Sequence, residues 1–163
     1  MSNLPDFAYQ RMTARADARS AFDTATENAR RRILMFDRDE TFYGLSRPDL
    51  ADRFDAFLRR GPDSQIQILL QKTVHFALAC PRLMTLMLRH GERLSVREVG
   101  GAATHFERGL CVFDDAVVLR RPHLERPVTV WDSSDDAIAE AAHVLTDMAE
   151  QAGPALSPVA TGL

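Results

Sequence analysis

The sequence predicts an α/β fold in which a mixed, mostly parallel sheet ends in a hairpin and carries helices on both faces. Three observations support this prediction. The chain has 163 residues, of which 45% are hydrophobic and 26% charged, and these values suit one ordinary globular domain. Short apolar runs alternate with segments of helical periodicity, as in β-α-β units with parallel strands. Two apolar runs then flank Asp114-Asp115, which indicates a hairpin.

The first part of the chain predicts an arm, a helix, a strand and a second helix. Residues 1–12 show no periodic pattern and are expected to form a flexible arm. Residues 13–31 carry small and aromatic apolar side chains at helical spacing. The apolar run 32–36 predicts a buried strand. Residues 49–60 predict a helix, which Gly61-Pro62 ends.

The middle of the chain continues the alternation. Residues 65–70 predict a second strand and residues 94–99 a third one, with cleanly alternating polarity. Between them, Pro81 suits the first turn of a helix that extends to His90. Because parallel strands end at one edge of a sheet, a ligand is expected beyond their carboxyl ends.

The last part predicts the hairpin and a closing helix. The hairpin comprises residues 110–119, and residues 128–131 predict one more short strand. Residues 135–151 have an apolar helical face. We therefore expect a single α/β domain over residues 13–152, followed by a flexible tail at residues 153–163 that is rich in proline, glycine and alanine.

Composition excludes several functions. The net charge of -3 provides no overall basic field, so neither a nucleic acid nor a membrane is an expected partner. Cys80 and Cys111 lie far apart without metal-binding spacing and predict reduced thiols. The N-terminal residues lack the apolar core of a secretory signal, which favours a cytoplasmic protein. Lys72 is the only lysine, so a mechanism that needs a catalytic lysine has one candidate.

One local motif indicates phosphate chemistry. The strand at residues 33–36 is followed by Asp37, Asp39 and Thr41, a D-x-D-x-T pattern. It resembles the first motif of haloacid-dehalogenase-type phosphatases, which implies Asp37 as nucleophile, Asp39 as general acid/base and Mg²⁺ as cofactor. The later motifs of that family are missing or out of order. In that family a Ser or Thr comes before the lysine, whereas here Lys72 precedes Thr73. We keep this phosphatase as an alternative. The other interpretation of the same residues is a polar loop between strand and helix, with acidic side chains near the helix N-terminus.

A longer resemblance extends from Ala29 to Ala152. It rests on local strings that occur in a shared order: residues 29–36, 38–43, 66–71, 94–99 and 110–122. These strings and the order of elements resemble one half of the phospholipase-D-like fold. They are similar to poorly characterised bacterial domains of that superfamily, sometimes fused to acetyltransferase domains. The resemblance implies a mixed sheet with a hairpin.

Active members of that superfamily use H-x-K-x4-D, in which His attacks phosphorus and Lys holds the phosphate oxygens. With Asp114 as the motif's Asp, Glu107 stands at the His position and Gly109 at the Lys position. His105 lies two residues too early, and no lysine follows it. The resemblance therefore implies the fold and a degenerate site. We expect a non-catalytic binding or interaction module, without metal or other cofactor.

The hairpin suggests an anion site. It returns Arg120 and Arg121 beside Arg108 and His105, so guanidinium groups gather that can bind a phosphate-bearing ligand. Arg120 and Arg121 are adjacent, so in a strand they point to opposite faces and only one can face a pocket. The expected partner is an unknown protein or an anionic small molecule. Pairing into a homodimer is a third, structural role that we consider.

Overall fold

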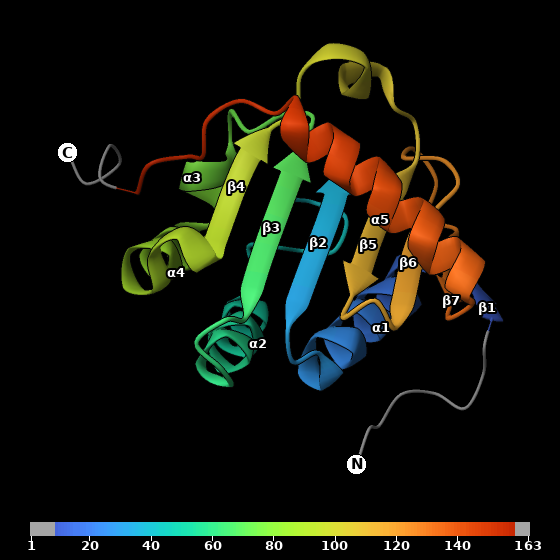
Figure 1. Cartoon of the computed structure of the whole chain (residues 1–163), viewed down its shortest axis with the longest axis horizontal. Helices are drawn as coiled ribbons and strands as arrows, with labels where there is room; N and C mark the ends of the chain where they lie inside the picture. Colours follow the sequence, from blue (N-terminus) through green and yellow to red (C-terminus); the bar gives the residue numbers. More distant parts are fainter. Residues whose placement is uncertain (1–8, 159–163) are drawn as a thin grey trace.

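A computed structural model describes residues 9–158, and in this part seven strands form one sheet in the order β1-β7-β6-β5-β2-β3-β4 (Figure 1). The strands are β1 (Tyr9–Met12), β2 (Arg32–Asp37), β3 (Gln65–Leu70), β4 (Leu94–Glu98), β5 (Gly109–Phe113), β6 (Val117–Arg121) and β7 (Thr129–Asp132). Strands β2, β3 and β4 run parallel, and all other neighbours are antiparallel. The α/β class, the parallel strands and the hairpin are confirmed. The parallel part comprises the three predicted strands, and the antiparallel part is larger than predicted because β1 pairs with β7 and extends it.

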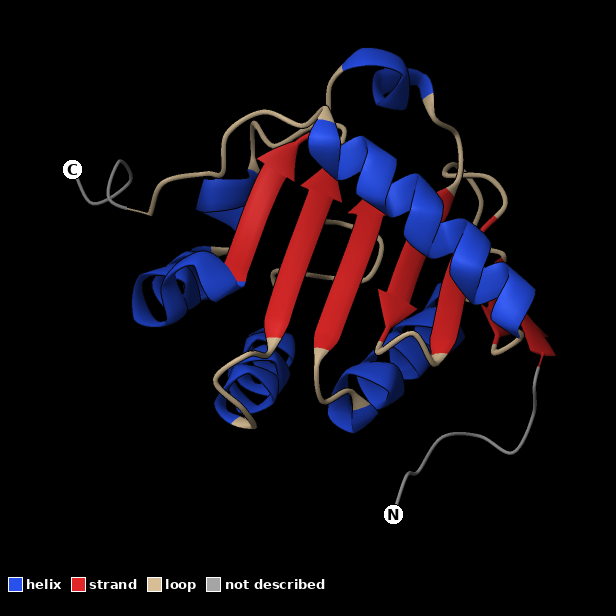
Figure 2. Cartoon of the chain, in the orientation of Figure 1, coloured by secondary structure: helices blue, strands red, loops and turns tan. Residues whose placement is uncertain are grey.

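Helices cover both faces of the sheet, as predicted (Figure 2). They are α1 (Arg15–Asn28), α2 (Pro48–Arg59), α3 (Phe76–Ala79), α4 (Pro81–His90) and α5 (Asp135–Glu150), with short 3-10 turns η1 (Gly91–Arg93) and η2 (Gly101–His105). Helix α5 crosses one face alone, and α1, α2 and α4 lie on the other face (Figure 1).

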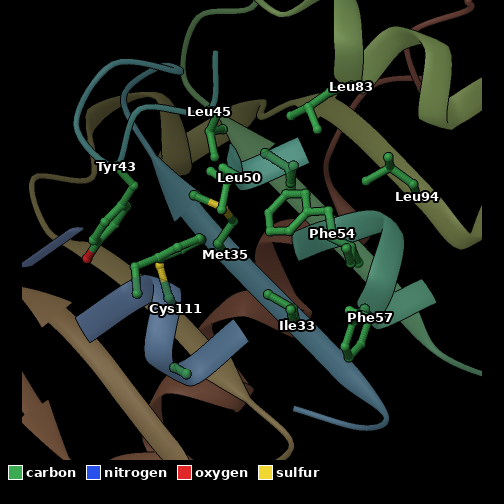
Figure 3. Close-up of a cluster of buried hydrophobic side chains, with 14 of the residues drawn as sticks. Ile33, Met35, Tyr43, Leu45, Leu50, Phe54, Phe57, Leu83, Leu94 and Cys111 are labelled. Atoms are coloured by element: carbon green, nitrogen blue, oxygen red, sulfur yellow. The ribbon is translucent and has the colours of Figure 1, made fainter. Parts of the chain in front are cut away.

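The side-chain alternation of β2 creates two cores. Ile33 and Met35 face the layer of α1, α2 and α4, where Phe54 of α2 packs in the same buried cluster (Figure 3). Leu34 and Phe36 face α5 and belong to a second cluster. Every residue of β2 after the first is buried, so this strand lies at the centre of the fold.

Both predicted flexible ends are partly ordered. Residues 9–12, expected in the arm, form β1 and pair with β7 along the whole strand. The predicted tail begins as a partner of β4: the Gly153 N–H donates to Glu98 O at 2.9 Å and the Leu156 N–H to Val96 O at 2.8 Å. Backbone hydrogen bonds to distant strands hold these two segments. Their order therefore needs no local apolar pattern, and the sequence gives no sign of it. Residues 1–8 and 159–163 of the two predicted ends lie outside the described residues.

The hairpin turn is built on Asp114 and Asp115, whose φ angles are +57° and +54°. The register pairs Phe113 with Val117, so residues 114–116 form the loop, and the Ala116 N–H donates to Phe113 O at 2.9 Å. Asp114 and Asp115 are the two central residues of this turn, and aspartate tolerates positive φ. The Asp114 carboxylate accepts the backbone N–H groups of Arg30, Arg31 and Arg32 at 2.6, 2.7 and 2.9 Å. The turn therefore also fixes the entry of the chain into β2.

The turn gives a stability prediction. Asp114→Ala removes the acceptor of three backbone N–H groups and leaves alanine at positive φ, so we expect the free energy of unfolding to fall by about 2–4 kcal/mol. Asp115→Ala is the matched control, because it has the same φ strain but loses only an exposed ion pair with Arg32. We expect it to cost about 1 kcal/mol. Equal losses in urea unfolding would assign the effect to strain alone.

Candidate functional site

Three residues share one row at the carboxyl end of β2. The register pairs Phe36 with Leu110 and Gly109 with Arg121, which places Gly109 between Asp37 and Arg121. Asp37 follows the same alternation as Met35, so the row faces the α1 side of the sheet. Asp37 is the last residue of a parallel strand, and ligands are expected at this end of such a strand.

Asp37 and Arg121 form a buried ion pair, and each residue is only 2% exposed. Arg121 Nη2 donates to Asp37 Oδ1, and Arg121 Nη1 donates to Leu124 O at 2.9 Å. The Arg121 guanidinium also stacks on Phe42, 3.6 Å from the ring centroid. The Arg38 N–H donates to the same Asp37 Oδ1 at 2.7 Å. Within residues 9–158, Arg121 Nε has no hydrogen-bond partner.

The surroundings of the pair control its protonation. Burial raises the pKa of Asp37 from 3.8 to about 6, against the opposing effects of Arg121 and the Arg38 N–H, and Asp39 adds to the rise. Burial also raises the pKa of the Tyr43 phenol and the Cys111 thiol well above their usual values. Tyr43 and Cys111 are therefore neutral at physiological pH, and Asp37 is the group of this cluster that titrates nearest to neutrality.

A pocket of about 370 Å³ lies over the pair. Four arginines and three carboxylates line it: Arg15, Arg38, Arg121 and Arg126, with Asp37, Asp39 and Glu125. Arg38 and Glu125 form a long, exposed ion pair at 3.5 Å, and the Asp39 carboxylate accepts the Thr41 N–H and hydroxyl at 3.0 and 2.7 Å. Among the described residues, Arg15 and Arg126 make no ion pair. The pocket thus offers cationic groups at its rim.

The structure divides the four residues of the predicted anion site between two faces. Arg108 and Arg120 lie under α5 beside a small pocket of about 100 Å³. Arg120 Nη1 is 3.4 Å from Asp132 Oδ2, and Arg108 Nη1 is 3.7 Å from Glu140 Oε1.

Arg121 faces the other side of the sheet, as strand alternation requires for a neighbour of Arg120. His105 is exposed at the end of η2 and lines neither pocket. The structure therefore places Arg121 apart from Arg108, Arg120 and His105, and the expectation that Arg120 and Arg121 face opposite sides agrees with the observed strand. Arg15 and Arg126 carried no signal in the sequence, because only the folded sheet brings them to the pocket over Arg121.

The alternative phosphatase site fits this geometry poorly. Asp37 is buried and its Oδ1 is bonded by Arg121 and Arg38, so it is not an accessible nucleophile. Asp39 is engaged by Thr41. Within residues 9–158, no group of three or more His, Cys, Asp or Glu side chains is placed to hold a metal ion.

Solved structures identify the fold as phospholipase-D-like. Nuc from Salmonella typhimurium, a phospholipase D family member, matches with a TM-score of 0.67 at 14% identity over 91% of this chain and 97% of Nuc. NucT from Helicobacter pylori matches with a TM-score of 0.63 at 14% identity over 88% of this chain and 98% of NucT. TrmBL2, an archaeal chromatin protein described with a novel mode of DNA binding, matches with a TM-score of 0.68 at 18% identity over 90% of this chain. The chain spans about half of TrmBL2, namely 54%.

The chain belongs to the family DUF7931, a domain of unknown function, whose model matches residues 14–148. A comparison with curated proteins found no match. Among the described residues, no helix has the length and apolar character needed to cross a membrane.

The raised pKa of Asp37 predicts a pH effect. The carboxyl has a pKa of 3.8 without these surroundings and about 6 in the fold, so between these values the folded state holds a proton that the unfolded state has released. The free energy of unfolding therefore contains a component that decreases as pH rises through this range. Asp37→Asn lacks it, so the stability of wild type minus that of the variant should decrease with pH. A difference in urea unfolding that stays constant or grows would show that Arg121 outweighs burial.

Proposed function

We propose that this chain is a phospholipase-D-like domain that binds a phosphate-bearing anion and does not hydrolyse phosphodiesters. The position of the Arg121 side chain carries the proposal. A Cβ atom at Gly109 would lie 3.3 Å from Arg121 Nε and 3.4 Å from Leu124 Cδ2. Gly109 is the position at which the resemblance to active members expects the phosphate-holding lysine. The space beside this strand is filled by an arginine that Asp37 already neutralises.

The nucleophile position supports the same proposal. Glu107 stands where the resemblance expects the attacking histidine, and a carboxylate there would repel a phosphodiester. His105 is exposed on η2, outside the row of Asp37, Gly109 and Arg121. Without a placed nucleophile and a free cation, little lowering of the barrier to hydrolysis remains. No observation favours the phosphatase alternative.

The pocket over Arg121 supports anion binding. Arg15, Arg38 and Arg126 line its rim, and Arg121 lies at its base. Asp39 and Glu125 oppose the binding of an anion, so we expect weak affinity that favours a multiply charged phosphate. The DNA binding described for TrmBL2 supports a binding role for this fold. The net charge of -3 and the size of the pocket favour a small anion here.

The compartment is part of the proposal. Cys80 and Cys111 are free and buried, which supports a protein of the reducing cytoplasm.

The absence of hydrolysis is tested with bis(p-nitrophenyl) phosphate. We expect wild type and His105→Ala to release nitrophenol no faster than buffer, because neither holds a nucleophile beside a phosphate-binding cation. Turnover by wild type that disappears in His105→Ala would contradict the proposal.

Anion binding is tested by calorimetric titration of phosphate and of a nucleoside triphosphate at low and moderate salt. We expect binding of about millimolar affinity that weakens with salt. Arg126→Ala, at the exposed rim, should lower the affinity about fivefold. Arg120→Ala is the matched control on the opposite face and should leave it unchanged.

Two results of this titration would contradict the proposed site. If wild type binds neither phosphate nor the nucleoside triphosphate at a ligand concentration about ten times the expected dissociation constant, the proposal of an anion site is contradicted. Loss in Arg120→Ala without loss in Arg126→Ala would move the site to the small pocket of Arg108 and Arg120 under α5.

A further inference from the structure

A buried ion pair forms the floor of the proposed anion pocket. Asp37 and Arg121 both line this pocket, and the Asp37 carboxylate neutralises the Arg121 guanidinium. An ionised carboxylate only accepts hydrogen bonds, so Asp37 in this form repels an anion and offers it no donor. The floor therefore suits an anion only if the charge of Asp37 is removed.

The hydrogen bonds of Asp37 leave one carboxylate oxygen for a proton. Arg121 Nη2 and the Arg38 N–H both donate to Oδ1, the Arg38 N–H at 2.7 Å. Within residues 9–158, no donor lies within hydrogen-bond distance of Oδ2. A proton on Oδ2 leaves both bonds to Oδ1 in place, because the other oxygen of a protonated carboxyl still accepts hydrogen bonds. Protonation therefore changes the pair from neutral to singly positive and keeps Arg121 in position.

The neighbouring strands contribute no other group that changes charge near neutral pH. Burial raises the pKa of Asp37 to about 6, while Arg121 and the Arg38 N–H act in the opposite direction. Burial also raises the pKa of Cys111 on β5 and of Tyr43 well above their usual values, so both remain neutral. The partner of Asp37 on β3 is the apolar Leu70.

The rim of the pocket carries arginines and two carboxylates. These are Arg15 of α1, Arg38 and Asp39 after β2, and Glu125 and Arg126 after β6. His123 is the histidine that follows Arg121 most closely in the chain, and it is exposed and does not line the pocket. Asp37 is therefore the group at the floor through which a proton can alter the binding of an anion.

We propose that the pocket binds its anion together with a proton, which Asp37 takes up at Oδ2. This inference rests on the proposed function, because the ligand is the same phosphate-bearing anion. The proton removes the negative charge from the floor and leaves the buried Arg121 cation without a counter-charge, which the anion then supplies. The protonated Oδ2 also becomes a hydrogen-bond donor, which an ionised carboxylate is not.

The sign of the pH effect follows from linkage. A bound anion raises the pKa of Asp37, and a proton on Asp37 strengthens anion binding by the same factor. Below a pH of about 6, most of the free protein already holds this proton. As the pH rises above this value, binding includes uptake of a proton from solution, so the affinity falls. It becomes constant again above the pKa of Asp37 in the anion-bound state.

The test is calorimetric titration of the full chain with inorganic sulfate at about pH 5 and about pH 8, at constant ionic strength. Sulfate keeps both negative charges over this range, whereas phosphate itself takes up a proton. Wild type should bind sulfate about tenfold more tightly at the lower pH. At about pH 6.5, titrations in two buffers of different ionisation enthalpy should show uptake of about half a proton per bound sulfate.

Two variants assign the proton to Asp37. Asp37→Asn imitates the protonated carboxyl, because the amide carries no charge and its oxygen still accepts from Arg121. It should bind sulfate at about pH 8 as tightly as wild type does at about pH 5, without proton uptake. A purely structural role of Asp37 would instead weaken binding at both pH values. His123→Gln removes an exposed histidine outside the pocket and is the matched control, which should keep the pH dependence of wild type.

The outcomes separate this inference from the proposed function. Sulfate binding by wild type with equal affinity at both pH values and no proton uptake would overturn the inference and leave the anion pocket in place. Absence of binding at either pH would contradict the proposed function and the inference with it. A pH dependence that persists in Asp37→Asn, or that disappears in His123→Gln, would assign the proton to another group. The proton uptake of wild type decides against the linkage without any variant, so the test holds even if Asp37→Asn does not fold.

Discussion

The contact between Arg121 and Asp37 joins the parallel and antiparallel parts of the sheet. Asp37 ends β2, Arg121 ends β6, and β5 lies between them. Strands that are two positions apart are separated by about 9.5 Å, a distance that an arginine spans only if the position between them leaves room. Gly109 is that position, and a Cβ there would already press on Arg121 Nε. The absence of a side chain at Gly109 and the reach of Arg121 therefore form one structural unit.

Burial of the Asp37–Arg121 pair costs the free energy of desolvation and gains the free energy of attraction between the two charges. Two buried charges lose their hydration, and their attraction offsets this loss only when the geometry is good. The Leu124 carbonyl, the Phe42 ring and the Arg38 N–H satisfy much of the pair, but Nε remains without a partner among the described residues. The pair therefore selects one arrangement of β2, β5 and β6 more than it adds net stability. The same arrangement engages the Arg121 guanidinium with Asp37, which is the observation on which the proposed function rests.

The sequence contained most of the fold, because the central strands carry local patterns. Residues 32–36 and 65–70 are apolar runs, and Gly61 and Pro81 mark helix boundaries, so β2, β3, α2 and α4 are predictable. Strand β1 was missed because three of its four residues are exposed and β7 holds it through backbone hydrogen bonds. For the site, alternation predicted that Arg120 and Arg121 separate. Which of them would face an acid could not be predicted, because Asp37 lies 84 residues away from Arg121 in the chain.

The arrangement of charge explains how an acidic chain can carry a pocket lined by four arginines. Many of its carboxylates serve internal contacts: Asp114 binds backbone N–H groups, and Asp55 binds His90, Arg59 and Arg89. A carboxylate engaged in this way neutralises charge in its own neighbourhood only, since screening limits its range. Lys72 donates its backbone N–H to Arg38 O at 2.9 Å, so the chain after β3 is joined to the rim of the pocket over Arg121. This pocket thus lies at the carboxyl edge of the parallel strands, where the sheet offers loops rather than core to a ligand.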